Sequence, residues 1–140
     1  MFLTEKELKE RFWQYYNYNH RAIRYEFESP IREGCADLIT VESYQDNIQF
    51  NAFEFKLQDI RKALLQAKAN SDYVHKSWIV VPIEKKTLIL ERYHSYLQEL
   101  KYIGVIAVEA GGKWEMIYKP VFRTDIKLHN HILKLMLNKI

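Results

Sequence analysis

The spacing of apolar residues switches along the chain from a helical period to a strand period and back, which limits the fold strongly. After Thr4, apolar side chains recur every three or four positions as far as about Tyr16–Tyr18, as on one face of an α-helix. Three segments with a strand pattern follow, at residues 25–28, 35–41 and 50–57. Short polar turns separate them, which favours an antiparallel meander. The helical period then returns from residue 58.

The rest of the chain continues this alternation. The further elements that the pattern predicts are a buried strand at 78–82, a helix around 90–100, strands at 103–108 and 114–118 joined by a Gly111-Gly112 hairpin, and a helix over 126–140. The whole order is helix, three strands, helix, strand, helix, two strands, helix. It predicts a single α/β domain over residues 1–140, with a mixed central sheet flanked by helices.

The first helix has a well-marked start. Thr4 is a candidate N-cap, and Glu7 three residues later completes a capping box. Leu3 and Leu8 have the spacing of a hydrophobic staple. For the second helix, Asp59 is the candidate cap residue.

Composition excludes several classes of protein. Hydrophobic residues make up 48% of the chain and charged residues 28%, which suits a folded domain with a core. The single cysteine, Cys35, excludes an intramolecular disulfide and a cysteine-based zinc site. A charged N-terminal segment and the lack of an apolar run of about 18 residues predict a cytoplasmic protein with no membrane partner. The net charge of +3 permits a nucleic-acid partner without requiring one.

Three charged residues stand out in the predicted strands. Alternate side chains of a strand share a face, so Glu54 and Lys56 lie on one side and Phe53 and Phe55 on the other. Asp37 is the lone charged residue of an otherwise apolar strand, a costly position unless the charge is paired or binds a metal. If the two strands form a hairpin, the two carboxylates converge at one strand end.

Such a cluster has a structural and a chemical interpretation. Asp37 and Lys56 could form a buried structural ion pair. Glu54 on the same face would leave the cluster negative, which favours a bound cation. Two carboxylates are suitable ligands for Mg²⁺, and a neighbouring lysine can orient an attacking water. Carboxylates that share one ion should have their nearest oxygens within roughly 3–5 Å, with Lys56 turned toward one of them.

The pattern Gly34-x-x-Asp37, an apolar run and then Glu54-Phe55-Lys56 resembles the signature of the PD-(D/E)XK, or restriction-endonuclease-like, nuclease superfamily. Ala36 stands where the family name has proline. That family is built on a core of helix, three strands, helix and strand, which matches the order predicted for residues 4–82. The resemblance implies that Asp37 and Glu54 bind Mg²⁺ or Mn²⁺ and that Lys56 assists hydrolysis.

The same resemblance implies further residues. Gln66, on the helix after the motif, would support the site, and Tyr73 follows it as an aromatic does in some branches of the family. Many members place another acid on the first helix, where Glu5, Glu7 and Glu10 are available, and Glu26 on the first strand is an alternative. Glu7 already has a role in the capping box, and the choice stays open.

Nucleic-acid contacts are less well defined. Arg61 and Lys62 lie on the second helix and, with Tyr73, form a candidate nucleic-acid-binding surface, although a solvated helix face is the commoner use of such residues. The expected function is Mg²⁺-dependent hydrolysis of DNA by an endodeoxyribonuclease, with a homodimer or protein partner supplying specificity. The alternative is a non-catalytic nucleic-acid-binding or assembly module on the same fold. A purely protein-binding domain would need an exposed apolar patch, for which the final helix is the candidate.

Overall fold

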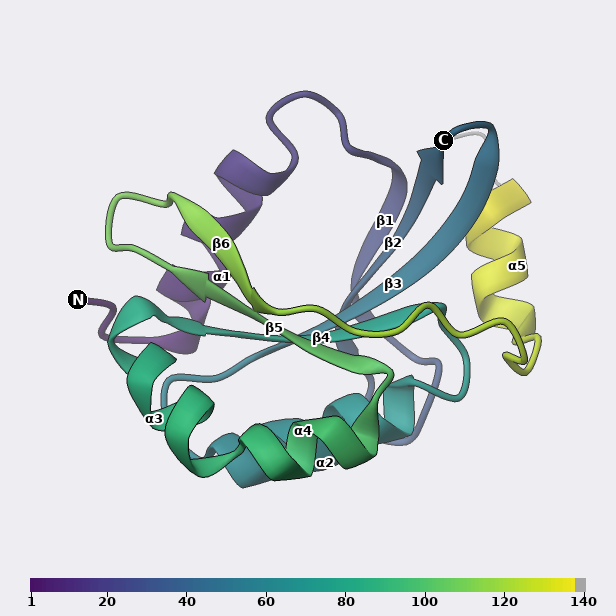
Figure 1. The fold of residues 1–140 in the computed structure, drawn as a ribbon. Helices are drawn as coiled ribbons and strands as arrows, with labels where there is room; N and C mark the ends of the chain where they lie inside the picture. Colours follow the sequence, from purple (N-terminus) through teal and green to yellow (C-terminus); the bar gives the residue numbers. More distant parts are fainter. Residues whose placement is uncertain (138–140) are drawn as a thin grey trace.

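The strands lie in the sheet in the same order as in the chain, β1 to β6 (Figure 1). The computed structural model describes residues 1–137. The strands are β1 (Ala22–Ser29), β2 (Ala36–Tyr44), β3 (Asn47–Phe55), β4 (Lys76–Pro82), β5 (Ile103–Val108) and β6 (Trp114–Tyr118). The first three form an antiparallel meander, β3, β4 and β5 run parallel, and β6 is antiparallel to β5. The predicted mixed sheet is confirmed.

Helices cover both faces of this sheet, giving a single α/β domain (Figure 1). They are α1 (Glu5–Tyr16), α2 (Ile60–Asn70), α3 (Lys86–Arg92), α4 (His94–Leu100) and α5 (Asn130–Leu137), with a 3₁₀ turn at Ile83–Lys85. Helix α1 packs on the face that carries Phe53 and Phe55. Helices α2, α3 and α4 cover the face that carries Ile79 and Val81. None of the helices within residues 1–137 has the length and apolar character needed to cross a membrane.

The start of α1 follows the sequence prediction in one respect and departs from it in another. The Thr4 hydroxyl accepts a hydrogen bond from the Glu7 amide at 3.0 Å, so the predicted N-cap is confirmed. The predicted staple is wrong, because Leu3 is 78% exposed. Phe2 is buried instead and packs in the same cluster as Leu8. The chain before the N-cap therefore turns Phe2, and not Leu3, toward the core.

Two later helices differ from the predicted ones. The helix expected around residues 90–100 is divided at Tyr93 into α3 and α4. Tyr93 (φ −110°, ψ 3°) ends α3 and precedes α4, a break that the apolar spacing of residues 90–100 did not indicate. The last helix begins at Asn130, so Ile126 precedes it, and Ile140 lies outside the described residues.

Helix α5 closes the face of the meander that α1 leaves uncovered. Its Ile132 and Leu135 are buried in one cluster with Ile39, Val41 and other residues of β2 and β3. The helix predicted as the candidate for an exposed apolar patch therefore uses these side chains in the core.

The pairing of β4 with β5 leaves no room for a side chain at Gly104. Its register partner is Trp78, and a Cβ at Gly104 would lie 2.7 Å from that ring and 2.5 Å from Pro120 Cδ. We expect Gly104→Ala to lower the free energy of unfolding by about 1–3 kcal/mol, because the buried Trp78 ring cannot move without disturbing the core. Urea unfolding followed by circular dichroism measures the change.

Gly111→Ala is the matched control, since a Cβ there would meet no atom within 4 Å. Its unfolding midpoint should stay close to that of the parent protein. Equal midpoints for the two variants would contradict the packing of β5 described above.

Candidate functional site

Asp37 and Glu54 meet at one end of the β2–β3 hairpin. Leu38 pairs with Phe53 across the two strands, and the next position outward brings Asp37 opposite Glu54. The Asp37 amide donates to Glu54 Oε2 at 3.2 Å, and the Phe55 amide donates to Asp37 Oδ2 at 2.9 Å. Each carboxylate is thus fixed to the backbone of the other strand.

The Glu54 carboxylate is almost completely buried, with 1% of its surface exposed. Its Oε2 also accepts a hydrogen bond from Asn70 Nδ2 at 2.8 Å and lies 3.1 Å from Arg32 Nη2. Arg32 Nε in turn donates to Asn70 Oδ1 at 2.6 Å. Arg32, Glu54 and Asn70 form a closed network between the β1–β2 loop, β3 and the end of α2.

Electrostatic effects on Glu54 oppose one another. Burial raises the pKa of Glu54, and the negative charge of Asp37 raises it further. The Asn70 amide, Arg32 and the Asp37 amide act to lower it, and the net result is a pKa above the ordinary value. Proton affinity at this carboxylate is therefore strengthened by its acidic neighbour, as expected for a place that can accept positive charge.

Lys56 lies just beyond the end of β3, where its amide donates to the Val80 carbonyl at 3.1 Å. Its side chain is 15% exposed, and Nζ is 3.9 Å from Glu5 Oε2 at the start of α1. Lys56 is thus paired with Glu5, and the predicted turn toward Asp37 or Glu54 is not what the structure shows. The buried ion pair at this end of the sheet joins Glu54 to Arg32.

Besides Glu54, acids from α1 and β1 border the same hollow as Asp37. A small hollow of about 120 Å³ is bordered by Asp37, Glu5 and Glu28 together with Lys6, Lys9 and Phe55. Glu28 is opposite Asp37 because Phe27 pairs with Leu38 and Ser29 with Ala36. Sequence reasoning had included Glu5 among the acids of the first helix but had missed Glu28, whose place depends on the strand register.

The two acids favoured from sequence lie elsewhere. Glu26 Oε1 is 2.6 Å from His131 Nε2 of α5. Glu10 is exposed on α1, where its carboxylate lies 4.0 Å from Lys6 Nζ. The structure brings neither of them into the network around Asp37 and Glu54.

Helix α2 contributes a residue that the sequence did not suggest. Asn70, one turn after Gln66, makes the contact with Glu54. Gln66 is half-buried, and its Oε1 is buried without a hydrogen-bond partner among the described residues. Residues four apart share a helix face, so Gln66 faces the same side one turn closer to Lys56. The sequence does contain a signal for Asn70, because this polar residue continues the apolar stripe of α2. It contains no such signal for Arg32, which lies in a predicted turn.

The candidate nucleic-acid residues are distributed unevenly. Arg61 and Lys62 are exposed in the first turn of α2. Tyr73 is half-buried against the cluster beneath α5, with its ring 5.2 Å from that of His129. Arg61 and Lys62 are accessible to a partner, whereas Tyr73 mainly fills space.

No group of three or more His, Cys, Asp or Glu side chains within residues 1–137 is placed to hold a metal ion. Asp37 and Glu54 are a pair of carboxylates, which leaves most of a cation's coordination shell to water or substrate. Searches of protein-family models, curated proteins and solved structures find no match to this chain. Function must therefore be inferred from the site.

Arg32 should stabilise the fold by neutralising the buried charge of Glu54. We expect Arg32→Met to lower the free energy of unfolding by about 3–5 kcal/mol near pH 8, because it leaves a buried carboxylate without its counter-ion. The folded-state pKa of Glu54, already raised, should rise further. The folded state then binds this proton more tightly than the unfolded state does. The stability difference between Arg32→Met and the parent protein should therefore shrink as the pH falls toward about 4.3, the pKa of glutamate in the unfolded chain.

Urea unfolding of the parent and Arg32→Met proteins at several pH values between about 5 and 8 measures this. Arg61→Met, at an exposed position of α2, is the control and should have little effect at any pH. A deficit of the same size at every pH would mean that packing, and not the Glu54 charge, is what Arg32 stabilises.

Proposed function

We propose that the protein is a divalent-metal-dependent nuclease that hydrolyses phosphodiester bonds within DNA. The observation that carries the proposal is a pair of hydrogen bonds between β2 and β3, from the Asp37 amide to Glu54 Oε2 and from the Phe55 amide to Asp37 Oδ2, which holds two carboxylates at one strand end. The order α1, β1, β2, β3, α2, β4 is also the order of the core that the family resemblance implies. A restriction-endonuclease-like core is part of this proposal.

The donor set suits Mg²⁺ or Mn²⁺. Hard cations prefer carboxylate oxygens, and Mg²⁺ is commonly held by one or two carboxylates together with water and phosphate. Asp37 Oδ1 and Glu54 Oε1 accept no hydrogen bond from the described residues, while Oδ2 and Oε2 are already bonded. Asp37 and Glu54 would hold the cation through these remaining oxygens. The bound cation would polarise the phosphate and make water a stronger nucleophile.

Lys56 and Gln66 would act beside that pair. Lys56 is held at the strand end by its backbone and by Glu5, with its ammonium close to the hollow that Asp37 borders. From there it would orient the attacking water and offset negative charge on the phosphate. The unpaired Gln66 Oε1 is an acceptor available to the same water. Arg61 and Lys62 would contact the DNA backbone near the site, and a second copy or another protein would add specificity.

A non-catalytic nucleic-acid-binding or assembly module is the second candidate, and one observation favours it. Arg32 and Asn70 both bind Oε2 of Glu54, as they would in a site with a purely structural role. In a nuclease, the cation would have to compete with Arg32 for Glu54. The two candidates therefore differ in whether Asp37 and Glu54 bind a metal at all.

Nuclease activity should depend on Asp37, Glu54 and a divalent ion. We expect the protein to cut plasmid, linear or branched DNA with Mg²⁺ or Mn²⁺ and to lose activity in EDTA. Asp37→Asn and Lys56→Ala should each reduce cleavage about 100-fold or more, since they remove charge that acts on the reacting phosphate. Glu91→Gln, exposed on α3, is the matched control. Failure to cut any of these substrates with either metal, by a protein that is folded by circular dichroism, would overturn the enzyme proposal.

Metal binding can be measured without catalysis. A ligand that binds only the folded state raises the melting temperature in proportion to the logarithm of its concentration. We expect millimolar Mn²⁺ or Mg²⁺ to raise the melting temperature of the parent protein and to leave that of Asp37→Asn unchanged. The same response in both proteins, or in neither, would favour the non-catalytic module.

A further inference from the structure

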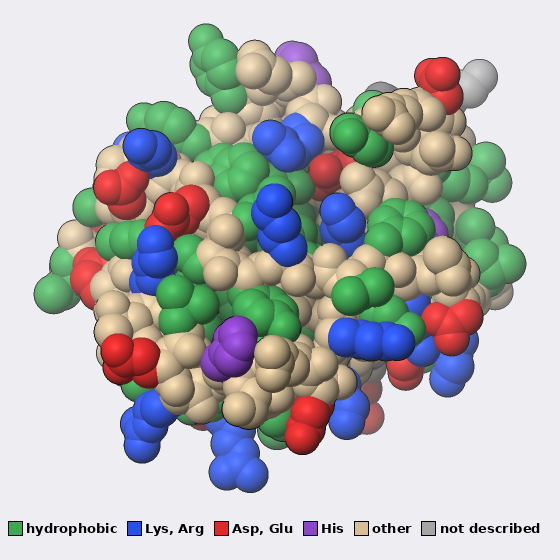
Figure 2. Space-filling model, in the orientation of Figure 1, with side chains coloured by type: hydrophobic (Ala, Val, Ile, Leu, Met, Phe, Trp, Pro, Cys, Tyr) green, Lys and Arg blue, Asp and Glu red, His purple; other side chains and the backbone are tan. Residues whose placement is uncertain are grey.

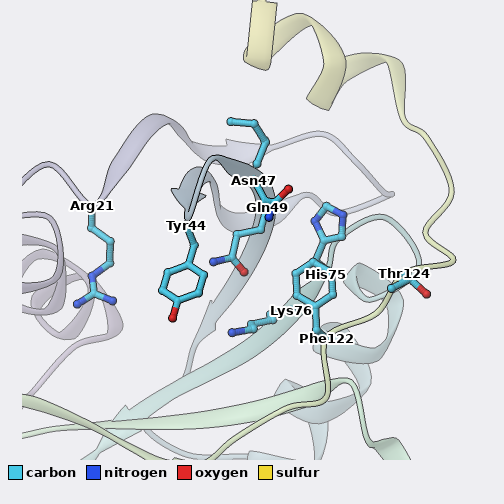
Figure 3. Close-up of a pocket in the computed structure, with 9 residues that line it drawn as sticks. Arg21, Tyr44, Asn47, Gln49, His75, Lys76, Phe122 and Thr124 are labelled. Carbon is cyan, nitrogen blue, oxygen red and sulfur yellow. The ribbon is translucent and has the colours of Figure 1, made fainter.

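A cavity of about 690 Å³ opens at the other end of the β2–β3 hairpin (Figure 3). Gln49 lies in it, five residues before Glu54 on β3, which is about 16 Å along the strand. An odd separation puts the two side chains on opposite faces of the sheet. The cavity is therefore separate from the candidate metal site, and its volume is in the range of small-molecule sites.

Aromatic rings form the sides of this cavity. The His75 ring stacks on Phe122 with ring centres 4.8 Å apart and an angle of 13° between the planes. His75 Nδ1 accepts a hydrogen bond from the Phe50 amide at 2.8 Å, which fixes the ring in place. Burial lowers the pKa of His75, so the ring is held neutral. Tyr44, 66% exposed, stands across the opening with Gln49 between it and the stacked rings (Figure 3).

Polar groups within and beside the cavity lack partners. Gln49 Oε1 and Asn51 Nδ2 are buried and form no hydrogen bond with the described residues. Asn51 follows Gln49 on the same face of β3, is 2% exposed, and uses its Oδ1 to accept from Trp78 Nε1 at 3.2 Å. Buried polar groups are nearly always paired. Of these two residues, Gln49 borders the cavity, and its side-chain amide is therefore the polar group placed to meet a bound molecule.

The charge around the cavity is positive. Arg21 and Lys76 border it, and within residues 1–137 no Asp or Glu side chain is among those that line it. The Arg21 guanidinium is held over the rings of Tyr16 and Trp114, 4.9 Å and 5.0 Å from their centres. Lys and Arg side chains gather near the middle of this face in Figure 2. Glu42 lies deeper, with its carboxylate hydrogen-bonded to the Tyr16 hydroxyl at 2.7 Å. Burial raises the pKa of Glu42 while Arg21 and Lys76 act to lower it, so this acid offsets part of their charge.

We propose that this cavity binds one nucleotide unit. The base would lie against the His75–Phe122 stack and Tyr44, with its polar edge toward the Gln49 amide. The phosphate would lie toward Arg21 and Lys76. Flat aromatic surfaces, an amide and two cations that border the opening together match the three parts of a nucleotide, whereas any one of them alone would be unspecific. The unit is either a free mononucleotide or an unpaired nucleotide of a single strand.

Isothermal titration calorimetry on the full chain tests this, in EDTA so that the result is independent of the metal site. The probes are the four 5′-mononucleotides, the matching nucleosides, inorganic phosphate and a short single-stranded oligonucleotide. Binding of mononucleotides more tightly than either nucleosides or phosphate supports a free nucleotide as the ligand. Binding of the oligonucleotide alone, lost in the variants described next, supports a nucleotide within a strand.

Phe122→Ala and Tyr44→Ala should each weaken binding about 5- to 150-fold, the effect of losing one base–aromatic stack. Val121→Ala and Tyr18→Ala, at exposed positions that do not border the cavity, are the matched controls. Absence of binding at millimolar concentrations, equal binding of phosphate and mononucleotide, or an equal response of cavity and control variants would each overturn the proposal.

Discussion

Burial of the Glu54 carboxylate is the constraint to which the surrounding structure is fitted. A carboxylate with 1% exposure loses its hydration and must be bonded by the protein. Its hydrogen-bond donors come from three separate parts of the chain. They are Arg32 in the β1–β2 loop, the Asp37 amide at the start of β2 and Asn70 in the last turn of α2. The charge therefore fixes how α2 and the loop sit against the end of the sheet.

Arginine is well suited to position 32 because a single planar group makes two directed contacts. Its Nε donates to Asn70 Oδ1, while Nη2 reaches Glu54 Oε2. A lysine ammonium could neutralise Glu54 but could not hold Asn70 in the same plane. Asn70 in turn offers its amide nitrogen to Glu54 only because its oxygen is taken by Arg32. The network thus sets the orientation of the Asn70 amide as well as the balance of charge.

Local sequence patterns could predict most of the elements, but not the partners within the site. The alternation in residues 50–57 predicted that Glu54 and the two rings of Phe53 and Phe55 lie on opposite faces of the strand. In the structure both rings are buried against α1. Glu28 could not be found in this way, because its position beside Asp37 depends on the register between β1 and β2. The pairing of Lys56 with Glu5 depends on how α1 packs across the sheet, which periodicity does not encode. Arg32 lies in the loop between β1 and β2, where no periodic pattern indicates which way a side chain points.

Burial is the largest cause of the raised pKa of Glu54, and the second cause, the negative charge of Asp37, would also favour the proposed metal ion. Asp37 adds negative potential at Glu54, which strengthens binding of any positive charge there, whether a proton, the Arg32 guanidinium or a divalent cation. Arg32 approaches Oε2 from the side of α2, whereas Asp37 and the hollow beside Glu5 lie on the side of α1. A cation entering from the hollow would meet Asp37 first and share Glu54 with Arg32. The arginine would then limit the affinity of the site for a metal ion, and without a metal it acts against burial and Asp37 by lowering the pKa of Glu54.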